Sequence, residues 1–235
     1  MSAAIPNAND PLPTGDSKRA AVQSMFDAIA PRYDFVNRLM TFGLDVLWRK
    51  QTMKLLALKP GSVVADLACG TGDFCREIRH GGHVPIGFDL AFGMLAAART
   101  DAQLVHGDAL GLPLIDDSVD AVTCGFALRN FVDLPSFLAE LGRIVKPGGR
   151  IGLLDVGQPS LPLVSHGYDF YFGKVVPKIG GLFSDADAYE YLPRSVAYLP
   201  PANELTTMIE AAGFERVTHA NLTLGLSQVY TATRR

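Results

Sequence analysis

The sequence has few of the residues that equip a secreted, metal-binding or nucleic-acid-binding protein. Only three of its 235 residues are cysteine, an odd number that favours small buried thiols in a reducing compartment over a disulfide framework. The five histidines show no metal-ligand spacing, so we expect no metal site. The net charge is −3 and the pI is near 5.9, whereas a nucleic-acid-binding protein usually carries an excess of basic residues.

Long apolar runs are also missing. None approaches the roughly 18 apolar residues of a membrane-spanning helix. The first sixteen residues are rich in Pro, Asn, Asp and Ala, and match neither a signal peptide nor an evident transit peptide. We therefore expect residues 1–16 to be a disordered lead and the protein to be cytoplasmic. Hydrophobic residues make up 48% of the chain, which suffices for one domain over residues 17–235.

The most informative stretch is residues 63–74, an apolar run followed by two closely spaced glycines. Val63–Leu67 is typical of a strand buried on both faces. Gly70 and Gly72 allow a tight turn and a close approach of the backbone to a ligand, and Asp73 suits the first turn of a helix. The stretch predicts the first βα unit of a doubly wound sheet, with a ligand at the carboxyl end of the strand.

The same stretch argues against a dinucleotide as that ligand. Gly70–Cys75 reads G-x-G-x-x-C, so the third glycine of the dinucleotide fingerprint is missing. Asp73 would place a carboxylate where a pyrophosphate has to bind, and Asp66 adds a second acid before the turn. Such a site favours a ligand with positive charge and no phosphate. S-adenosylmethionine, with a sulfonium, an ammonium and an adenosine, fits; a plain structural turn with solvated acids is the alternative.

Two further acids follow the next two predicted strands. Asp89 ends the second strand, Val84–Phe88, where an acid can accept hydrogen bonds from both ribose hydroxyls. Asp108 follows a short third strand, 104–106, and can accept from an adenine amino group. Each acid is ordinary alone, but the common placement of all three, Asp66 included, supports an adenosine ligand.

An Arg–Asn pair stands among apolar residues after the fourth predicted strand, 121–124. We expect Arg129 and Asn130 to take part in acceptor chemistry; a buried arginine paired with an acid is an equal alternative. Residues 158–201 then break the strand–helix alternation and are rich in Tyr, Phe, Gly and Pro. We interpret them as an inserted lid whose aromatic residues line a pocket for a planar apolar substrate or form a satellite core.

The whole pattern predicts an α/β fold: seven strands, doubly wound, with helices on both faces. Helices over residues 17–58 precede the sheet and either lean over the ligand crevice or form a packing appendage. A fifth strand, 150–156, is expected after a turn at Lys146–Gly149, and the strands 214–221 and 223–233 close the sheet. The sequence contains no internal repeat.

Several short motifs extend over most of the chain. They are Met25-Phe26-Asp27, Tyr33–Asn37, Gly43, Trp48, Asp66–Asp73, Leu128–Asn130, Arg143–Gly149, Lys178–Gly180, Asp185–Tyr189 and Tyr191-Leu192. By these motifs the chain, from about Val22 to its C-terminus, resembles the ubiquinone/menaquinone biosynthesis C-methyltransferases, a family of class I S-adenosylmethionine-dependent methyltransferases.

The resemblance implies a Rossmann-like class I methyltransferase sheet whose last strand is antiparallel. It implies cofactor contacts at Thr71, Asp89, Asp108 and Ala109, and Gly125 stands where the family has a cofactor-contacting serine. With the acids and glycines above, the expected cofactor-binding residues are Asp66, Gly70, Thr71, Gly72, Asp89, Asp108, Ala109 and Gly125.

The implied reaction is methylation of a ring carbon of a prenylated hydroquinone, such as demethylmenaquinol, in menaquinone or ubiquinone biosynthesis. Another phenolic or polyketide acceptor is one alternative, and a non-catalytic cofactor-binding partner in a quinone-making complex is another. Because a prenylated acceptor lives in the bilayer, we expect peripheral contact with the inner face of the membrane, through apolar surface on the helix from Ser17 and on the lid. We expect no nucleic-acid partner, and the sequence does not decide whether the chain forms a homo-oligomer.

Overall fold

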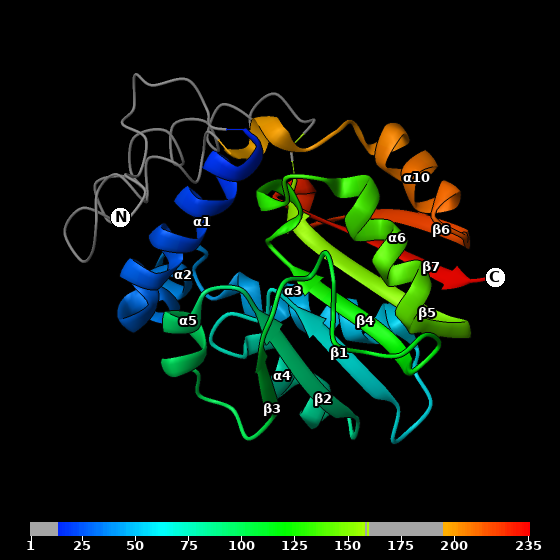
Figure 1. Ribbon diagram of the computed structural model, residues 1–235, viewed down its shortest axis with the longest axis horizontal. Helices are drawn as coiled ribbons and strands as arrows, with labels where there is room; N and C mark the ends of the chain where they lie inside the picture. The colour runs from blue at the N-terminus through cyan, green and yellow to red at the C-terminus, as the bar shows by residue number, and fades with distance from the viewer. Residues whose placement is uncertain (1–13, 158, 160–194) are drawn as a thin grey trace.

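The computed structural model describes residues 14–157, 159 and 195–235. Within these ranges seven strands form one sheet of order β3-β2-β1-β4-β5-β7-β6 (Figure 1). The pairings among the first five strands are parallel, whereas β7 runs antiparallel to both of its neighbours. The predicted α/β fold, with seven strands and an antiparallel last strand, is confirmed.

Strands and helices alternate along the parallel half of the sheet, except that β4 follows β3 without a helix between them. The elements are β1 Val63–Leu67, α4 Asp73–His80, β2 Val84–Asp89, α5 Phe92–Ala96, β3 Gln103–His106, β4 Val119–Gly125, α6 Leu134–Ile144 and β5 Val145–Val156. After them come α10 Ala202–Ala211, β6 Phe214–Leu222 and β7 Ser227–Arg234. Because the order of the strands reverses between β1 and β4, a crevice is expected outside their carboxyl ends.

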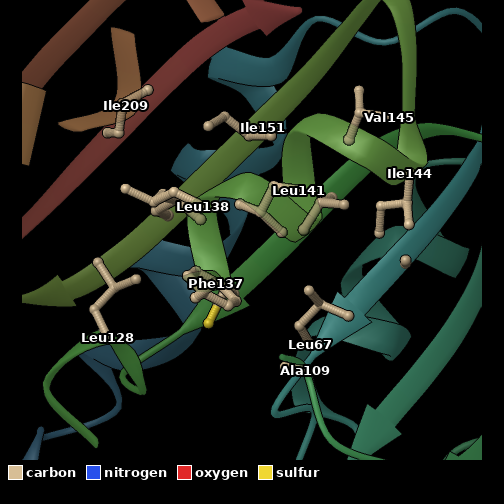
Figure 2. Packing of buried hydrophobic residues seen from close by; sticks show 14 of the residues in the cluster. Leu67, Ala109, Leu128, Phe137, Leu138, Leu141, Ile144, Val145, Ile151 and Ile209 are labelled. Atoms are coloured by element: carbon tan, nitrogen blue, oxygen red, sulfur yellow. The ribbon is translucent and has the colours of Figure 1, made fainter. Parts of the chain in front are cut away.

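The strands bury side chains on both faces, as their apolar runs predict. Ala65 and Leu67 of β1 belong to a cluster with α6 and α10, while Val64 belongs to a second cluster with Trp48 of α3 (Leu44–Leu56) and Phe74 of α4. Figure 2 shows side chains of the first cluster from α6, α10 and the strands. The three cysteines are buried free thiols, as predicted.

Two strand boundaries differ from the prediction. The turn expected at Lys146–Gly149 lies inside β5, because Val145 pairs with Val119 while Arg150 pairs with Ala121, so the residues between them bulge out of the ladder. Residues Thr223–Gly225, expected at the start of the last strand, form a short 3-10 helix.

In the described part of the chain three α-helices precede the sheet: α1 Gly15–Ile29, α2 Tyr33–Met40 and α3. The first begins at Gly15, two residues before the expected Ser17; residues 1–13 of the expected lead lie outside the described residues, as does most of the expected lid, 158–201. α1 lies across the carboxyl ends of the strands (Figure 1). Its Gln23 amide donates to the carbonyl of Leu90 over 3.1 Å. No helix of the described part of the chain is long and apolar enough to cross a membrane.

Candidate cofactor-binding site

A pocket lies where β1, β2, β3 and β4 end, under α1 and α2. Nearly all of the predicted site residues line it: Asp66, Gly70, Thr71, Asp89, Asp108, Ala109, Gly125 and Asn130. Residues from α1 and α2, among them Arg19, Phe26 and Tyr33, form the opposite wall. The N-terminal helices therefore lean over the crevice and are part of the site.

The turn after β1 requires its glycines for two different reasons. Gly70 has a φ of 56° and lines the pocket, so it brings backbone close to a ligand. Gly72 has a φ of 87°, and a Cβ there would lie 2.5 Å from Cγ2 of Thr100. Gly72 does not line the pocket; it shapes the turn and the start of α4.

Asp89 ties this turn to the end of β2. Its carboxylate accepts a hydrogen bond from the N–H of Gly70 over 2.7 Å and another from the N–H of Ala91 over 2.8 Å. Burial raises the pKa of Asp89 above its ordinary value. Since an ionised carboxylate has about four acceptor positions, capacity remains for the hydroxyls of a ribose in the pocket.

Asp108 joins α1 to the end of β3. One of its oxygens accepts from the N–H of Leu110 over 3.0 Å, and the other pairs with Arg19 over 2.6 Å. Ala109, next to it, is buried in the pocket wall. The expected adenine end of the pocket is thus closed by a residue of α1.

Asp66 is a deeply buried acid of the pocket wall. It is 1% exposed, and accepts from the Thr123 hydroxyl over 2.8 Å and the Cys75 thiol over 3.5 Å. Burial is the main cause that raises its pKa to about 7. A cationic ligand beside Asp66 would favour the ionised form, so this acid fits a ligand with a positive charge.

Asp73 does not have the role that the sequence suggested. Its carboxylate is buried and forms ion pairs with Arg38 over 3.4 Å, with Arg49 over 3.2 Å and with Arg76. Three guanidinium groups compensate its charge, so Asp73 does not supply an uncompensated charge for a cationic ligand. Among these acids, Asp66 and Asp89 remain to interact with a cationic ligand.

Thr71 and Gly125 occupy the wall beside the turn. The Thr71 hydroxyl donates to the carboxylate of Asp34 in α2, a contact that the sequence did not indicate. Gly125 ends β4 with its Cα facing the ring of Phe74. Two sides of the crevice are therefore held by α2 and α4.

The Arg–Asn pair splits into two environments. Arg129 is 5% exposed, pairs with Asp155 of β5, and donates from Nε to the Ser195 hydroxyl over 3.0 Å. It does not line the pocket, so its geometry favours the alternative of a structural pair. Asn130 does line the pocket, and its Oδ1 is buried without a hydrogen-bond partner among the described residues.

Sequence reasoning missed Tyr33 and Arg49, which also line the pocket. Burial raises the pKa of Tyr33 to about 12. Both residues lie in helices that are separated from the strand ends in sequence, so no local pattern placed them there. The described residues contain no group of His, Cys, Asp and Glu able to hold a metal.

Solved structures titled as methyltransferases share this fold. An S-adenosylmethionine-dependent methyltransferase from Aquifex aeolicus aligns with a TM-score of 0.62 at 16% identity, covering 86% of this chain and 98% of that one. Phosphoethanolamine N-methyltransferase 2 from Haemonchus contortus, solved with S-adenosyl-L-methionine, aligns with a TM-score of 0.58 at 15% identity, covering 79% and 52%. At 15% and 16% identity, these two likenesses show that the chain shares the fold of these proteins.

The family is defined by sequence. The model of the ubiE/COQ5 methyltransferase family matches residues 14–234, and the chain belongs to that family. It is 41% identical to the demethylmenaquinone methyltransferase of Deinococcus radiodurans, over 95% of this chain and 97% of that protein. It is 38% identical to the ubiquinone/menaquinone biosynthesis C-methyltransferase UbiE of Geotalea daltonii, over 92% and 97%. The predicted family, enzyme class and cofactor are confirmed.

Proposed function

We propose that the protein transfers the methyl group of S-adenosylmethionine to a ring carbon of a prenylated hydroquinone, such as demethylmenaquinol. The names of its relatives support this acceptor. The observation that carries the proposal is Asn130, whose buried Oδ1 has no partner among the described residues and lies in a pocket wall with Phe126, Phe131 and Val132. A single hydrogen-bond acceptor among apolar side chains suits a planar apolar molecule with a hydroxyl group.

The bound cofactor supplies an electrophilic methyl group. The protein has to place an electron-rich ring carbon in line with it, which is mainly a matter of positioning. Asn130 Oδ1 accepts a hydrogen bond from the acceptor hydroxyl and so fixes the rotation of the ring. The apolar wall excludes water, which strengthens electrostatic interactions inside the pocket.

Arg129 acts through Asn130 in this proposal. Its buried pair with Asp155 and its bond to Ser195 anchor the short helix Leu128–Asn130. Ionising a phenol with a pKa near 10 at pH 7 costs roughly 4 kcal/mol. Asp155 compensates the charge of Arg129, so Arg129 contributes less to that ionisation than an unpaired cation would.

The test is incubation with labelled S-adenosylmethionine and reduced demethylmenaquinol, with the product identified by mass. We expect a product heavier by one methylene unit and labelled on the ring. Asn130→Ala should lower kcat while the cofactor affinity stays near that of the wild type. Transfer to a simple phenol but not to the quinol would favour the alternative acceptor, and tight cofactor binding without transfer would favour the non-catalytic partner.

The same acceptor implies contact with a membrane surface, since its prenyl tail stays in the bilayer. The structure alters one expectation here: Ala21, Met25 and Ile29, the apolar face of α1, are buried, so α1 turns that face toward the protein. We propose peripheral contact through other surfaces, and liposome flotation with quinol-loaded vesicles tests it. A protein that stays at the bottom of the gradient with both loaded and empty vesicles would favour a water-soluble acceptor.

A further inference from the structure

The pocket holds two basic side chains within the described part of the chain, Arg19 and Arg49. Arg19 is engaged with Asp108 at the expected adenine end. Arg49 projects from the middle of α3, is 5% exposed, and has no role in the site derived so far. A buried cation in the wall of a cofactor pocket can bind an anionic group of the ligand with any donors that the protein leaves unused.

The guanidinium of Arg49 is only partly used by the protein. Its Nη1 donates to Asp45 over 2.6 Å and pairs with Asp73 over 3.2 Å. Its Nη2 and Nε have no hydrogen-bond partner among the described residues. The two carboxylates therefore fix one side of the guanidinium and leave the remaining donors for a ligand.

The aromatic neighbours hold the guanidinium in place. Its central carbon lies 5.8 Å from the ring centroid of Phe74 and 5.3 Å from that of Phe126, within the range of a cation–π interaction. Burial alone would lower the pKa of Arg49, but the carboxylates of Asp73 and Asp45 raise it above its ordinary value. Arg49 is therefore a fixed, fully charged donor.

The order of the strands identifies the part of the cofactor that Arg49 faces. Asp108 follows β3 at the adenine end and Asp89 follows β2 at the ribose, so the methionyl end extends toward β1 and β4. Arg49 contacts Asp73, which follows the turn after β1, and Phe126, which follows β4. That end of the cofactor carries a carboxylate as well as an ammonium.

We propose that Arg49 binds the methionyl carboxylate of S-adenosylmethionine through Nε and Nη2. A guanidinium presents parallel N–H donors that match the two oxygens of a carboxylate. Asp66, on the same side of the pocket, interacts with the positive charge of the cofactor. The inference depends on the cofactor and not on the acceptor, so failure of quinol methylation would leave it standing.

The experiment measures the affinity of three ligands by calorimetry: S-adenosylmethionine, its decarboxylated analogue and 5′-methylthioadenosine. The last two lack the carboxylate. Arg49→Met should weaken binding of S-adenosylmethionine by about 10- to 100-fold, the usual effect of losing a charged hydrogen bond. Binding of methylthioadenosine should change less than about threefold, and the decarboxylated analogue, which is purely cationic, should bind as before or more tightly once the repulsion of Arg49 is gone.

Arg38→Met is the matched control. Arg38 pairs with the same two acids, Asp45 over 2.5 Å and Asp73 over 3.4 Å, but does not line the pocket. We expect it to change all three affinities by one common factor. If Arg49→Met also weakens all three ligands equally, or weakens none, Arg49 does not bind the carboxylate and the proposal is wrong.

Arg49→Lys provides a second test if the methionine variant does not fold. Lysine keeps the charge beside the acids but lacks the paired donors of a guanidinium. The affinity of the Arg49→Lys variant for S-adenosylmethionine should fall severalfold relative to its affinity for methylthioadenosine. An unchanged ratio of the two affinities would overturn the proposal.

Discussion

Replacing Gly125 by alanine should destabilise the protein through a single contact. A Cβ at this position would lie 2.7 Å from Cε2 and 2.9 Å from Cδ2 of Phe74, whereas packed carbon atoms lie about 3.5–4.0 Å apart. The ring is a member of the second core cluster, so displacing it disturbs the packing of that cluster. Gly125 has no positive φ, and the penalty is therefore steric alone.

Adding a methyl group to a packed site typically costs about 1–3 kcal/mol. For a domain of this size each kcal/mol lowers the melting temperature by about 2–4 °C, so Gly125→Ala should melt about 2–12 °C below the wild type. Urea titration followed by circular dichroism would give the free energy of unfolding. Gly111→Ala is the control, because nothing lies within 4 Å of its added Cβ, and it should change stability by less than about 1 kcal/mol.

A double variant separates this contact from a general effect of the substitution. Phe74→Leu removes the ring, so the pair Phe74→Leu and Gly125→Ala should cost less than the sum of the two single variants by about 0.5–3 kcal/mol. A Gly125→Ala variant that melts with the wild type, or strictly additive costs in the pair, would refute the steric argument.

Three further outcomes follow from the site. Asp89→Ala should weaken S-adenosylmethionine binding by about 1.5–3 kcal/mol, and calorimetry showing less than a twofold change would contradict its contact with the ribose. Because burial raises the pKa of Asp66 to about 7, the folded protein keeps a proton that the unfolded chain releases near pH 4. The free energy of unfolding should therefore fall between about pH 4 and 7, and urea titrations of Asp66→Asn should show a shallower fall, because the raised pKa of Asp89 contributes the remainder. Arg129→Ala should cost about 3–5 kcal/mol by leaving Asp155 buried and unpaired; unchanged stability with lost turnover would restore a catalytic role to Arg129.

The sequence predicted the residues whose positions follow from local patterns. Asp89 and Asp108 end apolar runs, and parallel strands place their ends along one edge of the sheet, so both acids reach the pocket as expected. The glycines of the turn after β1 were also predicted from a local pattern. Their backbone conformation depends on a few neighbouring residues and not on distant contacts.

The partners of charged side chains were not predictable in this way. Asp73 was expected to carry an uncompensated charge, but helices α2, α3 and α4 bring three arginines against it. For Arg129 the sequence left a role with the acceptor and a buried pair with an acid as equal alternatives, and it did not indicate that β5 would supply Asp155 as that acid. These pairings are set by how helices and strands pack together, and neither hydrophobic periodicity nor a short motif reports which charges will meet.

The position of β7 between β5 and β6 has a consequence for synthesis on the ribosome. Strands β1 to β4, which carry the crevice, emerge first, yet β5 gains its second neighbour only when residues 227–234 arrive. Until then the apolar stretch Ile151–Leu154 has one edge of unpaired N–H and C=O groups, a template for association with another chain. Nascent chains that stall after β5 should therefore depend on chaperones that cover an open strand edge, although their cofactor crevice is already encoded.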